Sequence, residues 1–216
     1  MTTAEHVNES AAGSVVGGAP AEPRVGFVGR GDELDALMKA LTAEQPRGPV
    51  LLWGYEGVGK TTLAAHAARA LQQSGRFSQV TYTRFSGGGL PELARYDVGR
   101  TLLGDLWTPS QEDAEQRALE ALQRNPTLLI WDQVEALLPG APGVSSGALL
   151  SELLELAERL TGEGGSRVCL IADSATANAA IWGRGQEGVG LAVGGLAHVS
   201  HDRLARLIGA DGQPDH

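Results

Sequence analysis

The sequence predicts an α/β fold in which a parallel sheet of about five strands is sandwiched between helices. Apolar segments at 49–53, 79–85, 126–132 and 167–171 alternate with segments that carry leucine and alanine at helical spacing. Most of these apolar segments are nearly free of polar residues, which is typical of parallel strands buried on both faces. Helices on both sides of one sheet are therefore expected.

The helices are expected before, between and after these strands. Leu34, Leu37, Met38 and Leu41 fall on one face of a helix that begins at Gly31. Further helical segments are 62–71, 90–106, 110–124 and 148–160. The pattern is weak over 172–190; beyond it, 191–193 predicts a last strand and 202–208 a last helix.

The 216 residues suit one domain with flexible ends. Residues 1–23 are rich in Ala, Gly, Ser and Glu, a composition that predicts a disordered tail or linker. We expect the folded domain over residues 24–209 and a frayed tail over 210–216.

Composition argues against several classes of partner. The formal net charge of −9 disfavours general affinity for nucleic acid or an anionic membrane. No apolar run reaches the roughly 18 residues that a membrane span needs, and the N-terminus lacks the apolar core of a secretory signal. The single cysteine, Cys169, lies in an apolar run typical of a core. We expect a cytoplasmic protein.

One motif carries chemistry. Residues 54–61 read G-x-x-x-x-G-K-T between a predicted strand and a predicted helix, the arrangement of a phosphate-binding P-loop. Lys60 is expected to reach the β- and γ-phosphates, and the Thr61 hydroxyl to ligate Mg²⁺. The predicted nucleotide-binding residues of this segment are Gly54, Tyr55, Glu56, Gly57, Val58, Gly59, Lys60, Thr61 and Thr62. The alternative is a chance glycine-rich turn, which the flanking strand and helix disfavour.

A P-loop needs an acid at the end of a neighbouring strand to position the metal. Asp132 ends the apolar segment 127–132 and is the predicted Walker B aspartate, so Thr61 and Asp132 form the expected metal site. The alternative role for Asp132 is to cap a turn after the strand.

Four segments resemble the STAND-type signalling NTPases, an AAA-like group that includes the NB-ARC and NACHT proteins. These segments are Phe27-Val28-Gly29-Arg30 with Glu33-Leu34, the P-loop with Thr62-Leu63-Ala64, the run 128–135, and the strand 167–171. The resemblance implies that Val28, Gly29 and Arg30 hold the adenine. It also implies that strand 167–171 lies between the P-loop and Walker B strands, which brings Asp173 and Ser174 near the γ-phosphate.

Two departures from the family pattern count against full activity. Gln133 stands where the family usually has Asp or Asn, and an amide can orient water without acting as a base. The segment Ala172-Asp173-Ser174 replaces a family arginine that contacts the γ-phosphate, a role that can contribute about 10³-fold or more in rate. Glu135 is a further acid, expected to be a solvated loop carboxylate.

The expected base is adenine. Guanine-specific P-loop proteins usually use N-K-x-D, and this chain has lysine only at positions 39 and 60, neither in such a motif. Promiscuity between nucleotides remains the alternative.

The leading hypothesis is an ATP/ADP-binding regulatory switch of signal transduction with slow Mg²⁺-dependent hydrolysis, in which Lys60, Asp132 and Gln133 act on the reacting phosphate. We expect nucleotide-dependent self-association and dependence on protein partners or flanking domains, without direct nucleic-acid or membrane binding. The alternatives are a hydrolysis-deficient nucleotide-binding interaction module and, less favoured, a small-molecule kinase. Whether the chain is a fragment, and which signal it senses, lie beyond the sequence.

Overall fold

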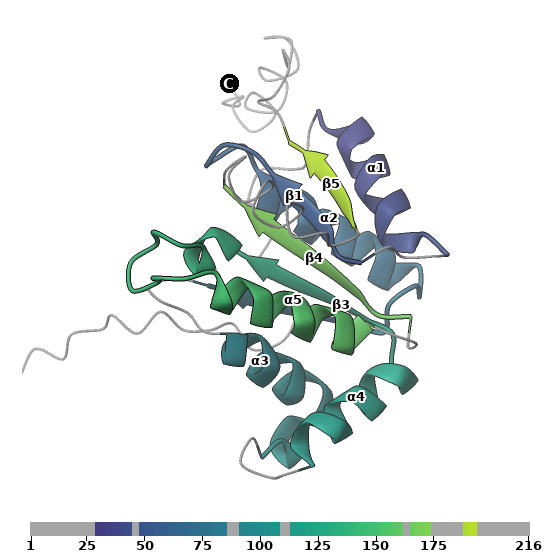
Figure 1. Cartoon of the computed structure of the whole chain (residues 1–216). Helices are drawn as coiled ribbons and strands as arrows, with labels where there is room; N and C mark the ends of the chain where they lie inside the picture. Colours follow the sequence, from purple (N-terminus) through teal and green to yellow (C-terminus); the bar gives the residue numbers. More distant parts are fainter. Residues whose placement is uncertain are drawn as a thin grey trace, which may run out of the picture.

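The computed structural model describes residues 29–44, 48–85, 91–108, 113–161, 165–173 and 188–193. These residues form a five-stranded, wholly parallel sheet in the order β2-β3-β4-β1-β5 (Figure 1). The strands are β1 (Val50–Trp53), β2 (Gln79–Arg84), β3 (Thr127–Asp132), β4 (Arg167–Ala172) and β5 (Val189–Ala192). The predicted α/β class and the strand count are confirmed.

The α-helices are α1 (Gly31–Thr42), α2 (Lys60–Gln73), α3 (Pro91–Leu103), α4 (Ala114–Arg124) and α5 (Ala148–Thr161). Two short 3₁₀ helices follow α3 and β3, at η1 (Gly104–Leu106) and η2 (Val134–Leu137). The predicted helix 90–106 therefore ends early, at Leu103, where Gly104 adopts a φ of 57°. The predicted tails 1–23 and 210–216 and helix 202–208 lie outside the described residues.

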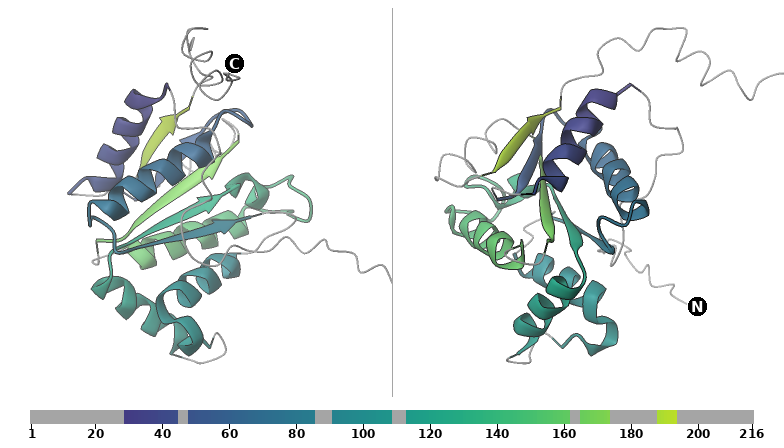
Figure 2. Two further views of the ribbon diagram at one scale, coloured as in Figure 1. Left: turned by 180° about the vertical axis from the view of Figure 1, so that it is seen from behind. Right: turned by 90° about the vertical axis from the view of Figure 1, so that its right-hand side faces the viewer.

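Helices α1 and α2 cover one face of the sheet, and α3 and α5 cover the other (Figure 2). Successive side chains along each strand point to opposite faces of the sheet, as the pleat requires. In β3, Leu128 and Ile130 pack with α1 and α2, whereas Leu129 and Trp131 pack with α5. All four side chains are fully buried, so β3 is inaccessible on both faces, as the apolar sequence predicts.

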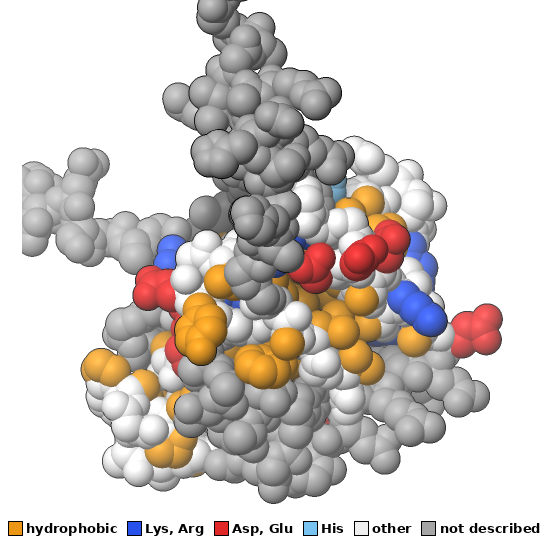
Figure 3. All heavy atoms as spheres, turned by 90° about the horizontal axis from the view of Figure 1, so that it is seen from above, with side chains coloured by type: hydrophobic (Ala, Val, Ile, Leu, Met, Phe, Trp, Pro, Cys, Tyr) orange, Lys and Arg blue, Asp and Glu red, His pale blue; other side chains and the backbone are white. Residues whose placement is uncertain are grey.

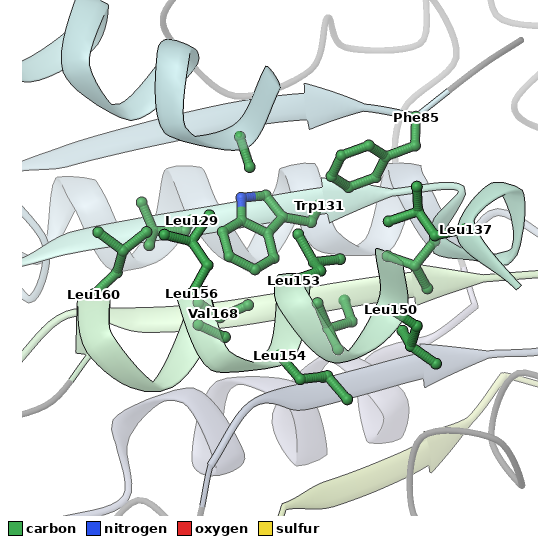
Figure 4. Packing of buried hydrophobic residues seen from close by; sticks show 14 of the residues in the cluster. Phe85, Leu129, Trp131, Leu137, Leu150, Leu153, Leu154, Leu156, Leu160 and Val168 are labelled. Atoms are coloured by element: carbon green, nitrogen blue, oxygen red, sulfur yellow. The ribbon is translucent and has the colours of Figure 1, made fainter. Parts of the chain in front are cut away.

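The two faces are built from different side chains. The α5 face is rich in leucine, and the Trp131 indole lies at the centre of its cluster, near Leu129, Leu153 and Phe85 (Figure 4). On the other face, α2 buries the alanines 64, 67 and 68 between Leu63 and Leu71. Small residues let α2 approach the sheet closely. Because α2 follows β1 through the P-loop, its first turn lies at the carboxyl edge of the strands.

Strand β4 lies between β1 and β3, the position implied for it by the family resemblance. The registers Trp53↔Ala172 and Asp132↔Ile171 align the carboxyl ends of three strands at one edge. Side chains and loops that follow these ends must converge there. Among the described residues, no helix has the length and apolar character needed to cross a membrane.

Candidate functional site

A cavity of about 340 Å³ lies at the carboxyl edge of the sheet. Its walls come from the P-loop, the first turn of α2, and the ends of β2, β3 and β4. The lining residues are Glu56, Gly57, Gly59, Lys60, Thr61, Thr62, Tyr82, Arg84, Asp132, Gln133 and Asp173. The predicted catalytic and metal-binding residues are thus brought together in one cavity, at the place where open parallel sheets bind ligands.

The P-loop depends on glycine for two different reasons. Gly57 and Gly59 have φ values of 76° and 92°, a left-handed backbone that side chains disfavour, and Gly59 immediately precedes α2. Gly54 is required by space, because a Cβ atom there would lie 2.3 Å from the Val193 carbonyl oxygen. The loop therefore wraps back over the start of α2, whose first N–H groups lack partners within the helix and suit an anion.

Lys60 is buried, with only 4% of its side chain exposed. Its Nζ donates hydrogen bonds to the carbonyl oxygens of Gly54 (3.0 Å) and Tyr55 (2.8 Å). It also forms an ion pair with Asp173 Oδ1 at 2.6 Å. The ammonium is thus held across the P-loop by two carbonyls and one carboxylate. A phosphate must displace some of these contacts to reach it.

The expected metal ligands contact each other directly. Thr61 Oγ1 donates to Asp132 Oδ2 at 2.8 Å, and the Tyr82 hydroxyl donates to the same oxygen at 2.8 Å. Asp132 Oδ1 accepts from the backbone N–H of Gln133 at 2.9 Å. A hydroxyl and a buried carboxylate are hard oxygen ligands of the kind Mg²⁺ prefers, so these residues fit the ion. Burial and the Asp132 charge raise the pKa of Tyr82 well above its ordinary value, so it remains a donor.

Gln133 adopts the left-handed conformation, with φ 61° and ψ 42°. It is the one non-glycine residue with positive φ in the described part of the chain. Such a backbone carries strain for a long side chain and is often found at functional sites. Gln133 Oε1 accepts a hydrogen bond from Arg84 Nε at 3.0 Å, so the amide is fixed at the cavity wall.

The sequence predicted that Glu135 is a solvated loop carboxylate, and this prediction was wrong. It lies in η2, and its Oε2 accepts a hydrogen bond from the backbone N–H of Asp173 at 3.2 Å. Partial burial raises the pKa of Glu135 above its ordinary value. The physical reason is the 3₁₀ turn after β3, which points the side chain back toward the end of β4. Glu135 thereby holds the residue that pairs with Lys60.

The predicted adenine-binding segment is only partly described. Val28 lies outside the described residues, as does Ser174. Arg30 is buried, and its guanidinium donates to the carbonyl oxygen of Val58 in the P-loop. Gly29 is exposed, with φ 83°. Arg30 therefore fastens the segment before α1 onto the phosphate-binding loop, and its role toward a base stays a prediction.

Other P-loop residues contribute unequally. The Tyr55 side chain is 83% exposed, and Val58 packs against the hydrophobic core beside α2. Neither lines the cavity, so any contact with phosphate would come from the backbone. Glu56 and Thr62 do line it.

Two cavity residues, Tyr82 and Arg84, were missed from the sequence. Both lie in β2, which pairs in parallel with β3 so that Arg84 is opposite Asp132. The available signal was the alternation of 79–85, which places Tyr82 and Arg84 on the same face of the strand. The order of the strands was also needed, because it places the end of β2 next to the Walker B aspartate.

Known proteins share this architecture. The sequence profile described as "AAA ATPase domain" matches residues 26–209. No curated protein sequence matches the chain. Among solved structures, the chain resembles the Aeropyrum pernix ORC2 protein in its ADPNP-ADP complexes, with 24% identity and a TM-score of 0.54 over 81% of this chain and 49% of that one.

It also resembles the Aeropyrum pernix ORC1 protein in complex with DNA, with 19% identity and a TM-score of 0.52 over 85% of this chain and 49% of that one. The chain thus spans about half the length of each. At these identities the structural similarity establishes the fold. The family is shown by the profile, which spans most of the sequence and includes the P-loop, Asp132 and Asp173: the chain belongs to the AAA ATPase domain family.

Proposed function

We propose that the chain is the nucleotide-binding regulatory switch domain of a STAND-type signal-transduction ATPase, binding Mg·ATP and ADP and hydrolysing ATP slowly. The observation that carries this proposal is the convergence of Lys60, Thr61 and Asp132 in one cavity behind the P-loop. Lys60 would contact the phosphates, while Thr61 and Asp132 would hold Mg²⁺. When bound, the metal ion supplies charge neutralisation at the β- and γ-phosphates.

Slow hydrolysis follows from the groups that face the reacting phosphate. Gln133 is a neutral amide and cannot take a proton from water. Asp173 places a negative charge 2.6 Å from the Lys60 ammonium, which offsets the cation that the phosphates need. Both features would lower the rate of hydrolysis, and slow hydrolysis suits a switch that has to remain in its ATP-bound form.

The STAND assignment is supported by the segment before α1. Arg30 belongs to the F-V-G-R entry and donates a hydrogen bond to the Val58 carbonyl oxygen, which joins the entry segment to the P-loop. We propose that the backbone of Val28, Gly29 and Arg30 binds adenine. Adenine binding would then be communicated directly to the phosphate loop.

A switch acts by differential affinity for two conformations. We propose that ATP favours a self-associating form and ADP a resting form, with partner proteins or further domains completing the closure over the nucleotide. Direct nucleic-acid binding is not part of the proposal. The net charge is −9, and on the face shown in Figure 3 the described basic side chains are scattered among acidic ones.

A second candidate is a nucleotide-binding interaction module without hydrolysis. Gln133 favours it, since the residue after Asp132 is held by Arg84 in a strained backbone conformation and supplies no base. The two candidates differ in a single measurable quantity, the turnover of bound ATP.

Turnover of Mg·ATP by the purified chain tests the proposal. We expect slow phosphate release that disappears in Lys60→Ala and persists in Lys39→Ala, the matched change at the other lysine of the chain, which is exposed on α1. Gln133→Asp should raise the rate. No release from the native chain, with Lys60-dependent ATP binding retained, would establish the non-hydrolysing module in place of the slow ATPase.

Self-association is tested separately by sedimentation with Mg·ADP and with a non-hydrolysable ATP analogue. A larger sedimentation coefficient with the ATP analogue is expected. Identical profiles with both nucleotides would contradict the switch for this chain.

A further inference from the structure

The end of β2 contributes a cation to the nucleotide cavity. The parallel register of β2 and β3 sets Arg84 opposite Asp132, and both residues line the cavity. The Arg84 side chain is exposed at the cavity wall and is not packed into the core. An arginine at this point can extend toward a ligand without disrupting the fold.

The charges around the cavity make Arg84 distinctive. The charged residues that line the cavity are two cations, Lys60 and Arg84, and three acids, Glu56, Asp132 and Asp173. Lys60 is already ion-paired with Asp173. The hydrogen bond found for Arg84 within the described part of the chain goes to the neutral Gln133 amide. The positive charge of Arg84 is therefore the less compensated of the two.

The geometry of this hydrogen bond also sets which groups remain available. Arg84 donates through Nε, which leaves the two terminal nitrogens of the guanidinium as donors. Gln133 accepts through Oε1, which leaves its NH₂ group as a donor. The groups left on the pair are thus mainly donors. Donors of this type, one of them fully charged, match the oxygens of a phosphate.

We propose that Arg84 recognises the γ-phosphate and makes the cavity discriminate ATP from ADP, while Gln133 positions its guanidinium. This inference rests on the proposed nucleotide site. The terminal phosphate carries the charge that distinguishes the two nucleotides, and Arg84 lies beside the metal-binding Asp132, opposite the P-loop. It would supply a cation that the segment Ala172-Asp173-Ser174 does not provide.

The test is the affinity for Mg·ADP and for a non-hydrolysable Mg·ATP analogue, measured by calorimetry on the native chain, Arg84→Ala and Arg84→Lys. We expect Arg84→Ala to weaken analogue binding by about tenfold or more and ADP binding by less than about twofold, since a charged hydrogen bond contributes on this scale. Arg84→Lys should restore part of the loss because the charge is kept. Arg124→Ala, at an exposed position on α4, serves as the matched control.

Gln133→Ala separates positioning from contact. If Arg84 contacts the phosphate, Gln133→Ala should lower the affinity for the ATP analogue less than Arg84→Ala does. The double variant should have the same affinity as Arg84→Ala. Equal losses of ADP and analogue binding in Arg84→Ala, or no loss of either, would overturn the inference. Failure of the proposed function looks different, because the native chain would then bind neither nucleotide through Lys60.

Discussion

The two sides of the nucleotide cavity are built in different ways. One side is a single continuous segment, residues 54–62, which presents backbone groups and Lys60 from a glycine-rich turn. The opposite side is assembled from three strand ends that are distant in sequence, and it presents the side chains of Arg84, Gln133 and Asp173. The first side suits any polyphosphate. In our proposal, the second determines which phosphate is distinguished and how fast ATP is hydrolysed.

In our proposal, the groups that bind the nucleotide and the groups that act on its terminal phosphate therefore lie on separate elements. The P-loop side has the glycines, the lysine and the helix N-terminus that phosphate binding needs. The opposite side has an amide after Asp132 and an acid beside Lys60. Changes on the first side should remove nucleotide binding altogether. Changes on the second should alter selectivity, affinity or rate while binding persists.

Asp132, at the boundary between the two sides, is expected to give the largest effect of the second group. Asp132→Asn removes the anionic metal ligand and nearly keeps the volume, while one of the two acceptor oxygens becomes an NH₂ donor. We expect the affinity for Mg·ATP to fall by about tenfold or more, since metal contacts contribute several kcal/mol of charge stabilisation. Calorimetry with Mg²⁺ and with EDTA measures the change, and the variant should lose most of its metal dependence. Undiminished metal dependence would remove Asp132 from the metal site.

Asp173 is expected to act in the opposite direction. Asp173→Asn removes the carboxylate 2.6 Å from Lys60 Nζ, so the ammonium is released for phosphate and an anion is removed from the cavity. ATP affinity should rise by about fivefold, because partly exposed ion pairs contribute about 1 kcal/mol. The matched control is Asp105→Asn, an acid fully exposed on η1. Weaker ATP binding in Asp173→Asn would show that this carboxylate supports the nucleotide.

Tyr82 should give the smallest effect. Tyr82→Phe deletes the hydroxyl that donates to Asp132 Oδ2 at 2.8 Å and leaves the ring in place. Thr61 still donates to the same oxygen. We expect Mg·ATP affinity to fall by about threefold, which corresponds to one modest hydrogen bond. Competition binding against a fluorescent ATP analogue resolves a change of this size, and a loss as large as that of Asp132→Asn would contradict the supporting role.

Cys169 offers a check that each variant retains the fold. The thiol is buried in β4, on the face of the sheet that packs against α1 and α2, and burial raises its pKa to about 12. It should therefore resist thiol reagents at neutral pH in the native chain and react once denaturant is added. Rapid labelling of a variant without denaturant would mean that its binding data report unfolding.

Much of this architecture was predictable because each strand is short, apolar and followed by a helical pattern. The P-loop was predictable because its function depends on a local backbone turn, which the glycines of 54–61 specify directly. Asp132 was predictable for a related reason, since it ends a buried strand. Each of these inferences depends only on residues that are close together in the sequence.

The remaining site residues required the order of the strands. Arg84 reaches the cavity because β2 pairs with β3, and Asp173 meets Lys60 because β4 lies next to β1. Both contacts join residues separated by dozens of positions, so no local pattern specifies them. For Asp173 the family resemblance supplied the strand order, and for Arg84 nothing in the sequence did. Glu135 was predicted to be solvated for the same reason. Its hydrogen-bond partner is the backbone N–H of Asp173, which follows a different strand, β4.

The most direct test of the central claim is a calorimetric titration of Mg·ATP into the native chain and into Lys60→Ala, with Lys39→Ala as the control. The account predicts one binding site in the native chain, retained in Lys39→Ala and lost in Lys60→Ala, because Lys60 supplies the buried ammonium of the cavity. Equal affinity of the native chain and Lys60→Ala would contradict the claim that this cavity is the nucleotide site.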